Sequence, residues 1–164
     1  MKTISKGILL VLLFFSGLAL AQDKRVSCDI LKQIDLKPIL GADHDPIAPF
    51  GRVACQAESN KIGRGWLSLA IEEGPVADLK KGLDFNKKMN QKERAKEAKV
   101  AAEPDLGPEA FSVRDNDNRK VEIYSLKGNK AVIVQGMWSM GPTIDDKIFG
   151  QLKDIAKTAQ SKLP

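Results

Sequence analysis

The stretch that decides the fold is Lys120–Trp138, with the sequence KVEIYSLKGNKAVIVQGMW. Two runs rich in β-branched residues, Lys120–Leu126 and Lys130–Trp138, flank the short turn Lys127–Asn129, which contains a glycine. This pattern is typical of a β-hairpin. The segment Ala131–Val134 is the most continuously apolar part of the chain after residue 21, so it is expected to be a central strand.

Further strands and helices are predicted on the N-terminal side of this hairpin, and one more helix follows it. The predicted strands are Gly51–Ser59, Gly65–Glu72, Ala110–Arg114, Lys120–Leu126 and Lys130–Trp138. The predicted helices are Cys28–Ile34, a short turn over Asp35–Leu40, Val76 to about Asn90, and Ile144 to about Lys162. Ser27 and Thr143 are the expected N-caps of the first and last helix. Consecutive hairpins predict an α+β domain: an antiparallel sheet of about five strands, packed by N-terminal, middle and C-terminal helices.

Length and composition restrict the classes of function. The chain has 164 residues, a formal charge of +5, one His and two Cys. This length suits one domain of ordinary size. With so few His and Cys residues, a His-rich zinc site, a four-cysteine zinc knuckle and a chain-borne iron–sulfur cluster lack the ligands that they need. No cofactor is therefore predicted.

Residues 1–21 have the order of a secretory signal peptide. Lys2 and Lys6 precede an apolar run over residues 8–15, and Ala19–Ala21 forms a small-x-small cleavage pattern. The alternative is an uncleaved anchor, but the apolar run is short for a membrane span. Cleavage after Ala21 would leave one domain over residues 22–164. It would remove two lysines and no acids, lowering the charge from +5 to +3. We expect a periplasmic or secreted protein with no membrane span.

The expected export affects the oxidation state that is predicted for the two cysteines. Cys28 and Cys55 are separated by 26 residues, and an oxidising compartment favours a disulfide between them. The alternative is a reactive thiol, which usually has a C-x-x-C motif or a partner His. The sequence contains no such motif.

Several landmarks then occur in a characteristic order. A cysteine opens a short helix, the segment Leu36–Gly41 follows, and the second cysteine lies on the first predicted strand. Glu103–Phe111, a hairpin around Leu126–Asn129 and a final amphipathic helix come later. This order resembles small exported bacterial domains of unknown function, similar in pattern to the PsbP-like α/β/α sandwich. The resemblance implies a disulfide between the two cysteines, a helix-covered antiparallel sheet and no shared catalytic residues. Many such domains are lipoproteins, but this chain has no cysteine at the cleavage point.

Candidate binding residues come from two groups. Trp66, Tyr124 and Trp138 lie on three predicted strands, where they either line a ligand cleft or fill the core. Arg64 and Arg114, near strand ends, are candidate polar anchors for a ligand.

The second group is the segment 80–99, which carries eight basic and three acidic residues, a net charge of +5. Lys87, Lys88, Lys92 and Lys96 are its candidate contacts to an anionic envelope surface. The alternative is a solvated helix face. Stacking aromatics are scarce there, so no nucleic-acid partner is predicted.

Other motifs favour structural interpretations. His44 lies between two aspartates in a loop, but adjacent residues rarely converge on one metal ion. Residues 115–118 begin like a calcium loop, but Arg119 and Lys120 occupy the next two positions, so an Asx-rich turn is the better interpretation. The sequence contains no G-x-S-x-G, H-E-x-x-H or glycine-rich phosphate loop. We expect a non-catalytic binding or accessory protein that holds a partner protein or a small ligand. The less favoured alternative is a small hydrolase using His44.

Overall fold

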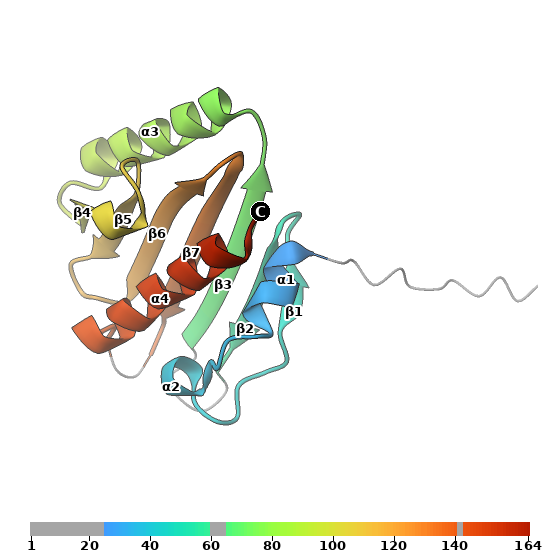
Figure 1. The fold of residues 1–164 in the computed structure, drawn as a ribbon. Helices are drawn as coiled ribbons and strands as arrows, with labels where there is room; N and C mark the ends of the chain where they lie inside the picture. The colour runs from blue at the N-terminus through green and yellow to red at the C-terminus, as the bar shows by residue number, and fades with distance from the viewer. Residues whose placement is uncertain (1–24, 60–64, 141–142) are drawn as a thin grey trace, which may run out of the picture.

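The computed structural model describes residues 25–59, 65–140 and 143–164 (Figure 1). Seven antiparallel strands form one sheet in the order β1-β2-β3-β7-β6-β5-β4. The strands are β1 Ala48–Phe50, β2 Ala54–Glu58, β3 Gly65–Glu73, β4 Ala98–Ala102, β5 Phe111–Asp115, β6 Lys120–Lys127 and β7 Lys130–Trp138. The predicted signal peptide lies outside the described residues, so it stays a prediction.

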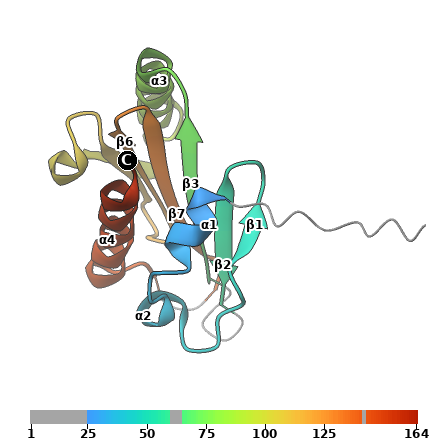
Figure 2. The same cartoon turned by 45° about the vertical axis from the view of Figure 1, so that its right-hand side comes forward.

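The helices cover the two faces of this sheet unequally. They are α1 Val26–Leu31, α2 Lys37–Leu40, α3 Val76–Glu93 and α4 Asp146–Lys162, with a 3-10 turn η1 at Pro104–Leu106. Helices α1, α2 and α4 lie on one face, and α3 lies on the other (Figures 1 and 2). We call these the α4 face and the α3 face. Among the described helices, none combines the length and the apolar character that a membrane crossing requires.

The hairpin of β6 and β7 is confirmed, and β7 lies in the centre of the sheet between β3 and β6. Lys127 pairs with Lys130 at the turn, where Gly128 has a φ of 57°. This left-handed conformation favours glycine, because other residues have a Cβ that clashes there. The turn therefore fixes the register, and the register decides which side chains lie on which face.

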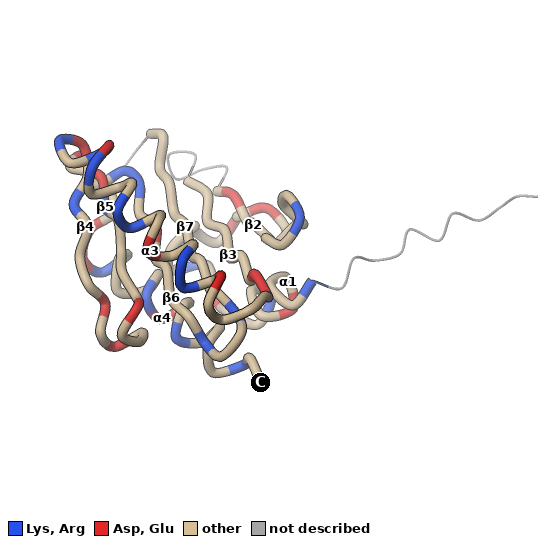
Figure 3. Tube along the Cα trace, turned by 90° about the horizontal axis from the view of Figure 1, so that it is seen from above, with Lys and Arg blue, Asp and Glu red and all other residues tan. Residues whose placement is uncertain are grey.

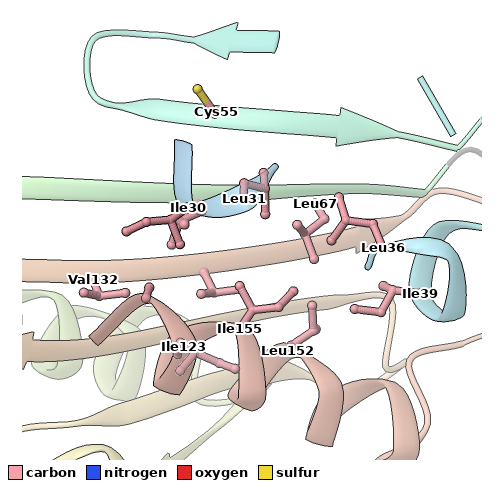
Figure 4. Packing of buried hydrophobic residues seen from close by; sticks show 14 of the residues in the cluster. Ile30, Leu31, Leu36, Ile39, Cys55, Leu67, Ile123, Val132, Leu152 and Ile155 are labelled. Atoms are coloured by element: carbon pink, nitrogen blue, oxygen red, sulfur yellow. The ribbon is translucent and has the colours of Figure 1, made fainter. Parts of the chain in front are cut away.

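The main core lies between the α4 face and its three helices. Figure 4 shows Ile30 and Leu31 of α1 and Leu152 and Ile155 of α4 in the same layer as Leu67 of β3. Trp138 is also part of this core, and its indole lies over two strand glycines. A smaller hydrophobic cluster lies on the α3 face, and its buried members are Leu83, Ala98, Phe111, Val113 and Tyr124. Leu83 is the buried residue of α3.

The disulfide prediction is confirmed. Cys28 of α1 is bonded to Cys55 of β2, with 5.1 Å between their Cα atoms, and both residues are buried. The bond attaches the N-terminal helix to a strand near the edge of the sheet. Ser27 reinforces the same attachment, because its hydroxyl donates a hydrogen bond to the Val53 carbonyl over 2.9 Å.

Three predictions about local structure were wrong. The sheet has seven strands and not about five, because β1 and β4 were missed. Ser27 lies inside α1, whose N-cap is Arg25. The N-cap of α4 is Asp145 rather than Thr143, and its side chain accepts a hydrogen bond from the Ile148 amide over 2.7 Å.

Candidate functional site

The three candidate aromatics are distributed over both faces of the sheet. Trp138 is buried in the core of the α4 face. Tyr124 lies on the α3 face, where its ring stacks on Phe111 with 4.7 Å between centroids. Trp66 pairs with Met137, the neighbour of Trp138, so alternation along the strand places Trp66 on the α3 face. The three side chains therefore do not surround one cleft.

Arg114 is the candidate anchor that does line a cleft; Arg64 lies outside the described residues. Arg114 Nη1 donates to Asp146 Oδ1 over 2.8 Å, and Nη2 donates to the Ile144 carbonyl over 2.7 Å. Its guanidinium lies over the Phe149 ring, 5.4 Å from the centroid. These contacts hold the side chain in one orientation between β5 and the start of α4.

The cleft has a volume of about 460 Å³ and lies where the β5–β6 turn meets the start of α4. Its lining consists of Lys99, Arg114, Asp115, Asn116, Asn118, Thr143, Asp145 and Asp146. The cations come from the strands β4 and β5, and two of the aspartates come from the N-terminus of α4. In the described part of the chain, Arg114 Nε is buried and has no hydrogen-bond partner. The cleft thus contains both signs of charge, with Arg114 and Asp115 side by side on β5, Lys99 on β4, and Asp145 and Asp146 at the start of α4.

The Asx-rich turn shapes one wall of this cleft. Asp117 Oδ1 accepts a hydrogen bond from the Arg119 amide over 3.2 Å, which is an Asx-type turn contact. Asn118 has a φ of 54°, and its carbonyl accepts from the Ile144 amide over 2.7 Å. The prediction of an Asx-rich turn is therefore confirmed. The turn positions the segment that leads into α4, which the sequence alone did not indicate.

A polar cluster on the α3 face was missed by the sequence analysis. Glu122 is only 6% exposed, and Lys120 Nζ lies 2.7 Å from its Oε1. Gln135 Nε2 donates to the same oxygen over 3.3 Å, and Tyr124 donates to Oε2 over 3.2 Å. Arg94 Nη1 lies 3.7 Å from Oε2. A buried carboxylate needs such partners, because an unpaired one would be costly.

Arg94 also joins this cluster to the turn that carries Asp115. It forms an ion pair and hydrogen bond with Asp115, and Asn90 of α3 accepts from its Nη1 over 3.0 Å. Burial raises the pKa of Asp115, and this outweighs the lowering effect of Arg94. Burial also raises the pKa of Tyr124, with Glu122 acting in the same direction. The raised pKa of Tyr124 is consistent with a protonated phenol that donates its hydrogen bond to Glu122.

The four candidate lysines do not share one surface. Lys88 and Lys92 point outward from α3 and are 73% and 83% exposed. Lys87 lies over the Phe111 ring at 6.0 Å, so it faces the sheet. Lys96 follows the end of α3, and its carbonyl accepts a hydrogen bond from Asn116.

Two exposed apolar side chains accompany the outward lysines. Phe85 is 63% exposed, and Met89 lies one turn further along α3. Lys81, Lys88 and Lys92 are related to them by the i, i+3 and i+4 spacing that places side chains on one side of a helix. We call this set of five residues the α3 stripe.

A second ionic cluster connects η1 to α4. Lys153 Nζ lies 2.6 Å from Glu103 Oε2 and 3.2 Å from Asp105 Oδ1. Ser112 donates to the other oxygen of the buried Glu103 over 2.7 Å. The hydrogen bond to Glu103 raises the pKa of Lys153. Every charged member has a partner, so this cluster is structural.

No family model, curated protein or solved structure matches this chain. The resemblance to the PsbP-like sandwich therefore stays a prediction. His44 lies in the loop before β1, where its Nδ1 is 2.8 Å from the Asp45 carbonyl oxygen. The hydrolase alternative also stays untested.

Proposed function

We propose that this chain is an exported, non-catalytic binding protein that holds a small zwitterionic ligand in the Arg114 cleft. The observation that carries the proposal is the arrangement of charge in the cleft, with Lys99 and Arg114 on the strands and Asp145 and Asp146 at the start of α4. A volume of about 460 Å³ falls within the usual range for small-molecule sites.

A cleft lined by side chains of both signs suits a ligand that carries both signs. A carboxylate is bound well by a guanidinium and an ammonium, and a ligand ammonium is bound by carboxylates. Arg114 is held in position by Asp146 and the Ile144 carbonyl before any ligand arrives, which lowers the entropic cost of binding. The ligand class is therefore a free amino acid or a similar small molecule with an amine and a carboxylate.

A thermal-shift and calorimetry panel tests this function. Amino acids should raise the melting temperature, whereas analogues that lack the amine or the carboxylate should raise it less. Lys99→Gln and Asp146→Asn should each weaken binding about tenfold, because each removes a charged contact of about 1.5 kcal/mol. Lys147→Gln is the matched control, since Lys147 is exposed beside the cleft but does not line it. Equal losses in the control, or no shift with any zwitterion, would contradict the proposal.

A second candidate function rests on the α3 stripe. Phe85 is exposed between Lys81 and Lys88, and an apolar side chain among lysines is typical of helices that bind anionic membrane surfaces. Sedimentation with phosphatidylglycerol-containing vesicles would measure this binding. Lys88→Gln with Lys92→Gln should reduce it, and added salt should reduce it further. Binding that depends on neither the lysines nor salt would exclude this function.

A further inference from the structure

Part of the α3 face is not covered by α3. Figures 1 and 2 show α3 beside the β4–β6 part of the sheet and away from β1 and β2. We call the α3-face side chains of β1, β2 and β3 the open sheet surface. Its members are Ala48, Phe50, Ala54, Gln56, Glu58, Trp66, Ser68, Ala70 and Glu72. Phe50 is 48% exposed, and Trp66 and Ala70 are half-buried. The surface therefore presents apolar area to solvent.

The charges on the open sheet surface are negative. Glu58 lies at the end of β2 opposite Trp66, and Glu72 lies near the other end of β3. Glu72 is close enough to Tyr124 to contribute to the raised pKa of that phenol, which agrees with its place on the α3 face. The described strands β1, β2 and β3 contain no Lys or Arg. A matching partner would thus combine apolar and cationic side chains.

The α3 stripe has that combination. Phe85 and Met89 provide exposed apolar area, and Lys81, Lys88 and Lys92 lie along the same line of the helix. Figure 3 shows the Lys and Arg positions distributed along the helix. An amphipathic helix laid on an apolar surface with complementary charges at its rim is a common mode of protein recognition.

The two surfaces cannot meet within one chain. Leu83 anchors α3 in the cluster that contains Phe111 and Tyr124. Lys80 Nζ pairs with Glu109 Oε1 over 2.5 Å, and Arg94 holds the end of the helix through Asp115. These contacts keep α3 over its own β4–β6 part with the stripe directed away from the sheet. The occupant that fits is a second copy of the chain.

We propose that two copies associate about a two-fold axis, with α3 of each lying on the open sheet surface of the other. Phe85 and Met89 would pack near Trp66, while the lysines of the α3 stripe would face Glu58 and Glu72 across the interface. The two-fold axis repeats the contact, so both open surfaces are covered and the assembly closes as a dimer. This inference goes beyond the ligand function, because the Arg114 cleft contributes no residue to either surface.

Charge exchange between the two surfaces tests the proposal with the full exported chain. One variant combines Lys88→Glu with Lys92→Glu, and the other combines Glu58→Lys with Glu72→Lys. Light scattering after size exclusion and sedimentation velocity would be measured from about 1 to 100 µM, with circular dichroism to verify folding. The unmodified protein should dimerise in this range. Each variant alone should have a dimer dissociation constant roughly 100-fold higher than that of the unmodified protein, because like charges then face each other across the interface.

Mixing the two variants distinguishes this interface from general loss of stability. In the mixed dimer, each α3 stripe again meets a surface of opposite charge, so the one-to-one mixture should regain dimer formation. A chain that carries all four substitutions should regain it as well. Lys32→Glu with Lys147→Glu is the matched control, since it makes the same charge change on exposed lysines outside both surfaces and should leave the dimer intact. A monomeric unmodified protein, or a mixture that stays monomeric, would overturn the proposal. Vesicle binding by such a monomer would assign the stripe to a membrane surface instead.

Discussion

Replacing Gly136 with alanine tests how Trp138 packs in the core. A Cβ at this position would lie 2.8 Å from Trp138 Cζ3 and 3.2 Å from Leu152 Cδ1. The first separation is shorter than the closest approach of ordinary carbon contacts. Trp138 is 1% exposed, so its ring cannot move toward solvent without losing its core contacts. Relief therefore requires movement of β7 or of α4, which packs on it.

The magnitude follows from the cost of overpacking a core. An extra methyl group in a well-packed interior costs about 1–3 kcal/mol, because side chains leave their preferred rotamers or the backbone shifts. We therefore expect Gly136→Ala to lower the free energy of unfolding by about 2 kcal/mol. For a domain of this size the melting temperature should fall by roughly 5–10 °C.

Two further glycines provide controls for the substitution itself. Gly82 in α3 and Gly150 in α4 have nothing within 4 Å of an added Cβ. Alanine inside a helix is more favourable than glycine by about 0.5–1 kcal/mol, so Gly82→Ala and Gly150→Ala should raise the melting temperature. Thermal unfolding gives the melting temperatures of all three variants and urea unfolding gives their free energies of unfolding, both followed by Trp fluorescence. If Gly136→Ala is neutral or stabilising, the described packing of Trp138 between β7 and α4 is incorrect.

Three more predictions concern the attachments between elements. Reducing the Cys28–Cys55 disulfide should lower stability by about 3–4 kcal/mol, measured by thermal unfolding with and without reductant. Asp145→Ala should cost about 1 kcal/mol, measured by urea unfolding, because α4 loses its side-chain cap. Lys153→Met should cost about 1–3 kcal/mol, because Glu103 stays buried without its cation. The pKa of Lys153 is raised above the ordinary lysine value of 10.5, so its ion pair stabilises the fold below pH 10.5 and is lost as the pH rises through the raised pKa. The melting temperature of Lys153→Met should therefore change less with pH in this alkaline range than that of the unmodified protein.

The sequence was sufficient to predict the central hairpin, the long helices and the disulfide. Each depends on a strong local signal: a glycine turn between two apolar runs, a 3.6-residue apolar period, or a pair of cysteines. The strands β1 and β4 gave no such signal. β1 has three residues and contains Pro49, and β4 is AKVAA next to a highly charged segment. Both strands form because the backbone N–H and C=O groups of the neighbouring strands, β2 and β5, hydrogen-bond to them. This pairing depends on the tertiary structure and not on the local sequence.

The candidate site was predictable only in part. Arg114 was found because it lies near a strand end, but its cleft depends on the turn and on the start of α4, which is 30 residues away in the sequence. Glu122 was missed although it does have a sequence signal. It stands between Val121 and Ile123 in an apolar strand, and a buried acid at such a position requires partners from other strands. Those partners, Gln135 and Arg94, are set by the strand order, which the local pattern does not specify.

The distribution of charge along α3 connects the fold to the proposed dimer. A helix of 18 residues with one buried side chain receives little stabilisation from the core. It is held instead by contacts on its inner side: Lys80 pairs with Glu109 before β5, Lys87 lies over the Phe111 ring, and Arg94 lies near Glu122 of β6. Those contacts do not account for the outward stripe, where lysines flank an exposed Phe85. Solubility alone would favour a fully polar surface there. Among the surfaces that the structure describes, the open sheet surface matches the stripe in both charge and apolar character, and the proposed two-fold dimer would bring the two surfaces together.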